Sequence, residues 1–150
     1  MEKLYIKEII TKFNNATIRY ILIGRQAVVL YGFPVLSFDY DFWVYPEDRD
    51  KLFDILLGED FEPSSLLEDK KPIVFFIKQE YKIDVFFAKS FGKLSFEDCF
   101  NNAKLLSEGD FFIRVASPKD LIYLKQFRKP LKAKDKEDIK FLTKLIRKKK

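Results

Sequence analysis

The sequence contains no histidine and a single cysteine, Cys99. Without histidine, the chain lacks the commonest general base at neutral pH and the commonest zinc ligand in proteins. A single cysteine also excludes a disulfide within the chain. Any chemistry must therefore depend on carboxylates, lysines, arginines, hydroxyls or a bound ion.

Long apolar runs are also missing. No stretch approaches the roughly 20 apolar residues that a membrane-spanning helix needs, and the opening "MEKLYIKEII" mixes charged and apolar residues, unlike a secretion signal. We therefore expect a cytoplasmic protein that does not bind membranes. The chain has 150 residues, of which 47% are hydrophobic, which predicts one domain with a substantial core.

Positive charge is concentrated near the C-terminus. Residues 125–150 contain 12 Lys or Arg and 3 Asp or Glu, a net charge of +9, whereas residues 1–124 carry a net charge of −4. Clustered basic residues attract polyanions such as RNA or nucleotides. A lysine-rich terminal helix that is merely soluble would give the same pattern, and both interpretations stay open.

The pattern of apolar and turn residues predicts alternating helices and strands of an α+β protein. We expect a single domain with a small mixed β-sheet and helices packed mainly on one face, a core of residues 17–116 and a helical region of residues 117–150. The expected helices are residues 2–15, 25–32, 45–58, 95–106, 117–127 and from 135 onward, and the expected strands are residues 17–24, 38–44, 72–79, 80–88 and 110–116.

The stretch "SFDYDFWV" places two aspartates in a run that otherwise reads as a buried strand. Alternate side chains of a strand point to opposite faces, so Asp39 and Asp41 share one face and Tyr40 and Phe42 the other. Two neighbouring carboxylates repel one another, and a cation between them relieves the repulsion. Oxygen ligands suit Mg²⁺ or Mn²⁺. Taken alone, the pair is more typical of a solvated strand face or a strand edge kept soluble by charge than of a metal site.

Two further motifs favour a binding site. In "ILIGRQA", a strand runs through Gly24 straight into a short helix, which offers backbone N–H groups to a phosphate. In "YKIDVFF", Asp84 projects from one face of a strand while Ile83 and Val85 point to the other. A carboxylate in so apolar a strand is costly without a partner. Pairing with a lysine such as Lys82 would be the purely structural explanation.

The order of these motifs resembles the DNA polymerase β-like nucleotidyltransferase superfamily. The first motif is "ILIGRQAVVLYGFPVLSFDYDFWV" and the second is "KIDVF"; the segment "SPKDLIYLKQFRKPLKAKDKEDI" looks like the closing elements of the small prokaryotic members, the minimal and abortive-infection toxin types. The resemblance extends over residues 20–142. The three motifs in order are far more specific than any one of them.

The resemblance implies a nucleotidyltransferase that uses Mg²⁺ or Mn²⁺ and an NTP. It implies that Gly24 and the backbone after it hold the triphosphate, that Asp39 and Asp41 bind the metals, and that Asp84 binds one metal and helps to deprotonate the acceptor hydroxyl. Lys125 would support the nucleotide, with Arg128 nearby. The alternative for these two basic side chains is that they extend past a core-facing surface to reach water.

The family pattern has a second Gly or Ser where this chain has Arg25. A side chain there could crowd the phosphates, or its guanidinium could bind them. The resemblance implies transfer of NMP to an RNA 3′ end or to a protein side chain, and a role in a toxin–antitoxin pair. The alternative is a catalytically inactive binding module of the same fold, acting as an antitoxin or an RNA-binding partner.

Overall fold

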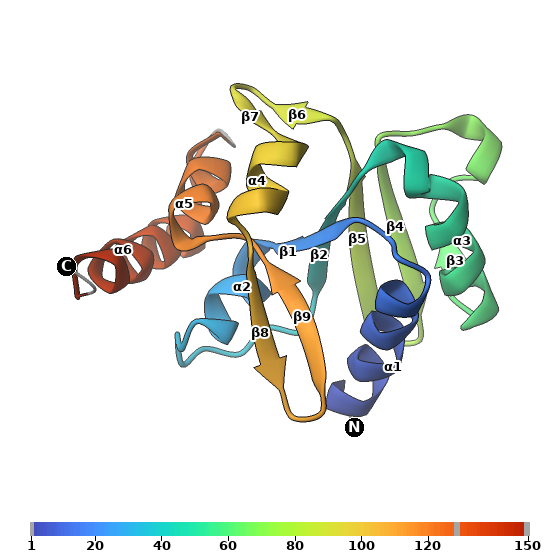
Figure 1. Ribbon diagram of the computed structural model, residues 1–150, viewed down its shortest axis with the longest axis horizontal. Coiled ribbons are helices and arrows are strands. Elements are labelled where there is room, and N and C mark those ends of the chain that lie inside the picture. Colours follow the sequence, from blue (N-terminus) through green and yellow to red (C-terminus); the bar gives the residue numbers. More distant parts are fainter. Residues whose placement is uncertain (1, 128–129, 149–150) are drawn as a thin grey trace.

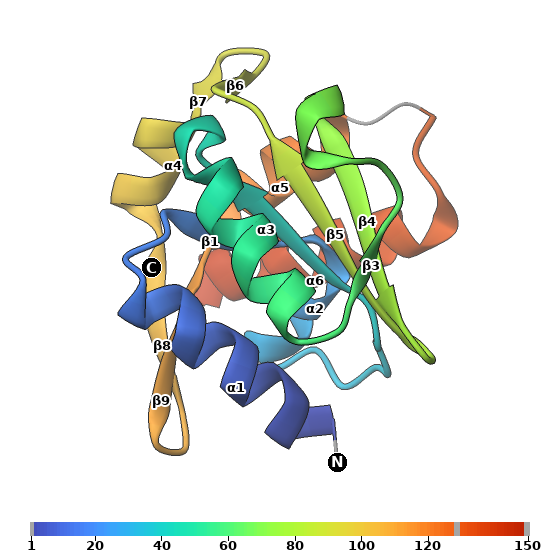
Figure 2. The ribbon, with the colours of Figure 1, turned by 90° about the vertical axis from the view of Figure 1, so that its right-hand side faces the viewer.

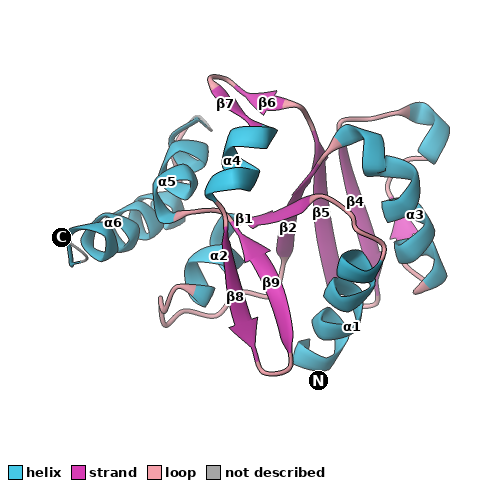
Figure 3. Cartoon of the chain, in the orientation of Figure 1, coloured by secondary structure: helices cyan, strands magenta, loops and turns pink. Residues whose placement is uncertain are grey.

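The computed structural model describes residues 2–127 and 130–148, and Figures 1 and 3 show helices on both sides of a twisted sheet. The helices are α1 (Glu2–Asn15), α2 (Gly24–Leu30), α3 (Arg49–Gly58), α4 (Phe96–Asn102), α5 (Pro118–Phe127) and α6 (Ala133–Lys148), with 3₁₀ turns at Pro46–Asp48 and Leu67–Asp69. The strands are β1 (Tyr20–Ile23), β2 (Tyr40–Val44), β3 (Glu62–Pro63), β4 (Ile73–Lys78), β5 (Tyr81–Phe87), β6 (Ser90–Phe91), β7 (Leu94–Ser95), β8 (Lys104–Glu108) and β9 (Phe111–Val115).

The main sheet has the strand order β3-β4-β5-β2-β1-β9-β8 and is mixed. Its centre is formed by β1, β2 and β5, in which β1 pairs antiparallel with β2, and β2 pairs parallel with β5. The outer pairs β4–β5 and β8–β9 are antiparallel hairpins. Strands β6 and β7 form a separate small hairpin. The strand that carries Asp41 is therefore flanked on both sides within the sheet.

Helices α1 and α3 cover one face of the sheet, and Figure 2 shows them side by side in front of it. On this face the ring of Phe42 from β2 packs edge-on against Phe13 of α1, with ring centroids 5.4 Å apart. Phe53 of α3 packs against Phe76 of β4. These side chains are almost completely buried, and burial of each large apolar side chain stabilises the fold by about 1.5–3 kcal/mol.

The opposite face carries α2 and α4, and α5 and α6 pack onto α2 (Figure 1). Trp43 of β2 points to this side, where its ring contacts Phe91 and Phe96 and its Nε1 donates a hydrogen bond to the Ala88 carbonyl at 2.8 Å. Because Asp41 lies two residues before Trp43 on the same strand, its side chain faces this side as well. The face therefore changes from apolar at Trp43 to acidic at Asp41.

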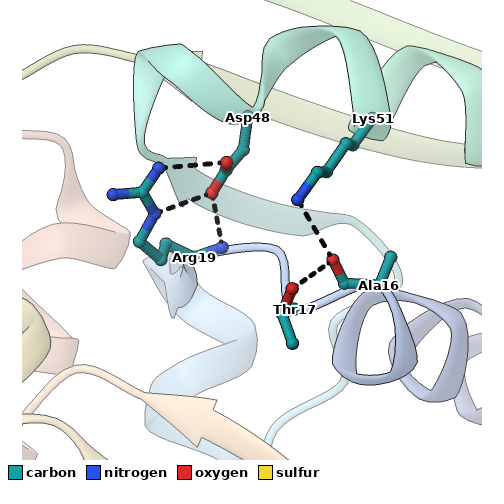
Figure 4. A network of polar contacts seen from close by, with 5 residues as sticks. All are labelled: Ala16, Thr17, Arg19, Asp48 and Lys51. Carbon is teal, nitrogen blue, oxygen red and sulfur yellow. Dashed lines mark hydrogen bonds and ion pairs between the residues drawn. The ribbon is translucent and has the colours of Figure 1, made fainter.

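An ion pair joins the start of β1 to the start of α3 (Figure 4). The carboxylate of Asp48 accepts hydrogen bonds from the Arg19 backbone N–H at 2.9 Å, from Nε at 2.9 Å and from Nη2 at 3.1 Å. Burial would raise the pKa of Asp48, but the hydrogen bonds and charge of Arg19 lower it below its usual range. This contact fixes one end of the central strand against the helix that covers it.

The predicted α+β class, the mixed sheet and the C-terminal helices are confirmed. The expectation that the helices pack mainly on one face was wrong, because α1 and α3 cover one face and α2 and α4 the other. One predicted boundary was wrong, because the expected helix of residues 95–106 ends at Asn102 and its last residues belong to β8. Ala103 is extended, and Leu106 pairs with Ile113 of β9. The loop expected between α3 and β4 contains the two-residue edge strand β3. Among residues 2–127 and 130–148, no helix is both long and apolar enough to cross a membrane.

Candidate active site

Gly24 stands at the turn where β1 ends and α2 begins. Its backbone has a φ of +77°, a conformation that residues with a side chain rarely adopt. A Cβ placed on Gly24 would overlap the carboxylate of Asp41. Two separate constraints therefore favour glycine at this position: the positive φ of its backbone and the close approach of the Asp41 carboxylate.

The sheet brings Asp41 and Asp84 together. They are paired residues in the parallel register of β2 and β5, so their side chains leave the same face of two neighbouring strands. The strand predicted over residues 38–44 begins only at Tyr40, so Asp39 lies directly before β2 and outside it. The three predicted metal-binding residues line a single cavity of about 410 Å³ together with Gly24. The full lining is Ile23, Gly24, Arg25, Ser37, Asp39, Asp41, Asp84, Phe86, Leu121, Leu124, Lys125, Lys132, Lys134, Asp135 and Asp138.

The environment of Asp84 disfavours its charged form. Its side chain is 18% exposed, and its Oδ1 is buried and accepts no hydrogen bond. Burial is the main reason that the pKa of Asp84 is raised, the neighbouring Asp39 raises it further, and Lys82 and Asp41 act in the opposite direction. The Lys82 ammonium lies 3.6 Å from Oδ1, beyond ordinary hydrogen-bond distance. Lys82 thus compensates the carboxylate only in part.

The donor atoms fit Mg²⁺ or Mn²⁺ bound together with a phosphate. Within residues 2–127 and 130–148, no three acidic or cysteine side chains are close enough to hold a metal by themselves. Mg²⁺ is usually held by one or two carboxylates, with phosphate oxygens and water completing its octahedron. The paired Asp41 and Asp84, the unbonded Oδ1 of Asp84 and the nearby Asp39 supply carboxylate oxygens of this kind. The arrangement suits a metal–nucleotide complex better than a bare ion.

Cationic side chains form the other half of the cavity. Lys125 of α5 is 8% exposed, and its Nζ lies 2.8 Å from Asp138 Oδ2 and 3.9 Å from Asp135 Oδ1. Arg25, the first residue after Gly24, donates from Nη2 to Glu137 of α6 at 3.0 Å. Lys125 and Arg25 were both predicted at the site, and both line the cavity. Arg128, the remaining predicted residue, lies outside the described residues.

Four charged lining residues of the C-terminal helical region were not predicted as site residues. Lys132 and Lys134 add positive charge, whereas Asp135 and Asp138 reach the cavity from one side of α6. Asp135 and Asp138 are separated by three positions, which places them on the same face of a helix. This spacing within "KDKED" was the available sequence signal. The side chain of Asp135 also accepts a hydrogen bond from the Lys132 backbone N–H at 3.1 Å.

The fold as a whole is found in proteins of known structure. No family model and no curated protein matches the sequence. The lincosamide antibiotic adenylyltransferase LnuA, solved with lincomycin bound, is 18% identical, with a TM-score of 0.69 over 95% of this chain and 94% of that one. The antibiotic-resistance factor ANT(2'')-Ia is 15% identical, with a TM-score of 0.69 over 97% of this chain and 86% of that one.

A third similar structure is an antigenic nucleotidyltransferase-like protein from Paracoccidioides brasiliensis. It is 19% identical, with a TM-score of 0.65 over 96% of this chain and 76% of that one. This chain has the nucleotidyltransferase fold. The predicted resemblance to nucleotidyltransferases is thereby confirmed at the level of fold. Identities below 20% establish the fold alone, so the reaction has to be argued from the site residues.

Proposed function

We propose that this protein is a metal-dependent nucleotidyltransferase that transfers NMP from an NTP to a hydroxyl group. The main observation in favour of this proposal is that Asp39, Asp41 and Asp84 line one cavity together with the Gly24 turn. Cationic side chains line the same cavity. Carboxylates for a metal and cations for phosphates are the two requirements of phosphoryl-group transfer. The nucleotidyltransferase fold supports the same reading.

Each residue has a defined task in this reaction. Asp39, Asp41 and Asp84 would hold Mg²⁺ or Mn²⁺, which when bound would neutralise phosphate charge during the transfer. Gly24 allows the backbone to approach the triphosphate closely, because no side chain projects from it. The cavity is also lined by basic side chains, which would stabilise the negative charge of the departing pyrophosphate: Arg25, Lys125, Lys132 and Lys134.

The chemical step is an in-line displacement at the α-phosphorus. The acceptor oxygen forms a bond to this phosphorus, and the bond from phosphorus to the bridging oxygen of the pyrophosphate breaks. The hydroxyl proton passes to the carboxylate of Asp84. The buried Oδ1 of Asp84 accepts no hydrogen bond in the structure, so an oxygen of this carboxylate is available to take the proton.

The acceptor is a hydroxyl compound, and three classes are to be tested. A protein side chain and an RNA 3′ end are the acceptors implied by the resemblance, and the role in a toxin–antitoxin pair stays a prediction with them. LnuA was solved with lincomycin, and ANT(2'')-Ia with adenylyl-2''-tobramycin. Small hydroxylated molecules therefore form the third class.

Isothermal titration with a non-hydrolysable NTP analogue, with and without Mg²⁺, tests the proposal. We expect Mg²⁺-dependent binding by the wild type and at least about tenfold weaker binding by Asp41→Asn, a loss of about 1.4 kcal/mol. Asp54→Asn is the matched control, because Asp54 is exposed on α3, away from the cavity. A radiolabelled NTP then reports transfer to each acceptor class. A folded wild type that binds no nucleotide would overturn the proposal and leave the inactive binding module.

A further inference from the structure

Asp138 is a completely buried carboxylate at the cationic end of the cavity. Its exposed fraction is 0%, and it lies between cations from two other elements. Lys125 Nζ of α5 is 2.8 Å from its Oδ2, and Arg25 Nε of α2 is 3.8 Å from its Oδ1. Burying an ion is costly unless opposite charges compensate it. The buried Asp138 is therefore compensated by the two cations that were predicted to bind the nucleotide.

The same two cations share their cavity with the carboxylates proposed to bind the metal. Arg25 directly follows Gly24, whose Cα lies against the Asp41 carboxylate. Without Asp138, Arg25 and Lys125 would be drawn toward the acidic group formed by Asp39, Asp41 and Asp84. An arginine paired with these carboxylates would compete with the metal for their oxygens, because both need the same negative charge.

The guanidinium of Arg25 keeps a donor available in its present position. Its Nη2 pairs with Glu137, whereas Nη1 is buried without a hydrogen-bond partner. A buried unpaired donor is costly, and a phosphate oxygen in the cavity would satisfy it. The Glu137 side chain is 58% exposed, so water screens its charge, whereas the buried Asp138 beside Nε attracts Arg25 with little screening and leaves Nη1 available.

We propose that Asp138 is a positioning residue that holds Arg25 and Lys125 on the α6 side of the cavity, so that these two cations do not compete with the metal for the carboxylates of Asp39, Asp41 and Asp84. This inference rests on the proposed function, because it assumes that these carboxylates bind the metal–nucleotide complex. In this role Asp138 acts through Arg25 and Lys125, its two ion-pair partners. Its role is to separate the positive half of the cavity from the negative half.

Binding of Mn²⁺, followed by electron paramagnetic resonance with and without an ATP analogue, tests this inference independently of activity. We expect Asp138→Asn, which keeps the shape and removes the charge, to weaken Mn²⁺ binding about tenfold. The matched control is Glu137→Gln, which removes the exposed partner of Arg25 and leaves Asp138 in place. This control should change Mn²⁺ affinity less than about twofold.

A second substitution separates positioning from a general loss of structure. In Arg25→Gln/Asp138→Asn the released arginine is absent, so Mn²⁺ affinity should return toward the wild-type value. If Asp138→Asn does not fold, Lys125→Met/Asp138→Asn removes both partners of the buried ion pair and carries the same test, with Arg25 as the released cation. Adding Arg25→Gln to that variant should again restore Mn²⁺ affinity.

The possible failures are distinguishable. A wild type that binds the Mn²⁺–nucleotide complex and an Asp138→Asn variant that binds Mn²⁺ equally well would overturn the positioning role and leave the proposed function standing. Weakened binding that is restored neither by Arg25→Gln nor by Lys125→Met would also overturn it, because neither released cation would then be the cause. A folded wild type that binds no metal–nucleotide complex would overturn both proposals together.

Discussion

At the scale of single residues, Gly24 is constrained both by its backbone conformation and by a neighbouring side chain. Its positive φ and the contact with Asp41 are separate constraints, and the chain offers a way to measure them apart. Gly109, in the turn between β8 and β9, has a φ of +73°, and a Cβ placed there would meet nothing within 4 Å. Gly109 therefore shares the backbone constraint of Gly24 and lacks the steric one.

Substitution of each glycine by alanine should give different results. Both variants should lose about 1–2 kcal/mol in the free energy of unfolding, because alanine is strained at positive φ. Only Gly24→Ala should also displace the Asp41 carboxylate and weaken Mg²⁺-dependent nucleotide binding at least about tenfold. Urea denaturation and titration calorimetry measure the two effects. Equal nucleotide affinity in the two variants would show that the Gly24 turn does not belong to the binding site.

At the scale of elements, the ion pair of Arg19 and Asp48 connects β1 to α3. We expect Asp48→Asn to lower the free energy of unfolding by about 2 kcal/mol at pH 7, because Asp48 is buried and its charge is matched by Arg19. Urea denaturation at several pH values measures this loss. The exposed Asp54→Asn on α3 is the control and should change stability by less than about 0.5 kcal/mol.

The same variant predicts a pH dependence of definite sign. The pKa of Asp48 is lower in the folded protein than in the unfolded chain, where it is about 3.9. The contribution of ionised Asp48 to the free energy of unfolding is therefore fully present above the pKa of the unfolded chain. It is lost as the pH falls through the lower pKa of the folded protein. The difference between wild type and Asp48→Asn should be constant near neutral pH and shrink below about pH 4. If the difference in free energy of unfolding persists below about pH 4, the loss in Asp48→Asn comes from altered packing and not from the lost charge.

Most elements could be predicted because their information is local. Ser95 accepts a hydrogen bond from the Asp98 backbone at the start of α4, as the spacing of the two residues indicated. Strand β8 could not be predicted in this way, since "AKLL" is compatible with a continuing helix. Its extended conformation depends on pairing with β9, whose residues follow later in the chain. Pairing within the sheet outweighed local helix propensity.

The residues of the acidic half of the candidate site were predictable from the strand pattern, whereas Arg25 and Lys125 were predicted there mainly through the family resemblance. Asp41 and Asp84 stand out because they interrupt apolar strands, and alternation assigns them to one face. The spacing of Asp135 and Asp138 places them on one helix face, but it does not indicate that Asp138 is buried, since charged residues are common along an amphipathic helix. Its burial follows from packing of α6 against α2, where Arg25 meets Glu137 from 112 positions away in the chain. Contacts of this kind cannot be read from spacing.

At the scale of the whole molecule, the cavity lies between the sheet and the pair formed by α5 and α6. This pair is fixed to the rest of the protein by apolar packing, since Leu121 and Leu142 are buried in the common core. The rings of Phe141 of α6 and Phe33 after α2 are stacked with centroids 4.9 Å apart. The arrangement favours the predicted single domain, in which the helical region of residues 117–150 does not unfold separately.

Calorimetric unfolding should therefore show one transition that moves as a whole when the nucleotide binds. A ligand at 100 times its dissociation constant stabilises the folded state by about 2.7 kcal/mol, and a ligand in this cavity would contact both β2 and α6. We expect Mg²⁺ with an NTP analogue to raise the single melting temperature of the wild type and to leave that of Asp41→Asn nearly unchanged. Hydrogen exchange should slow in β2 and α6 together. Two separate unfolding transitions, of which only one shifts to higher temperature when the nucleotide binds, would contradict this prediction. They would show that the C-terminal helices unfold as an independent unit.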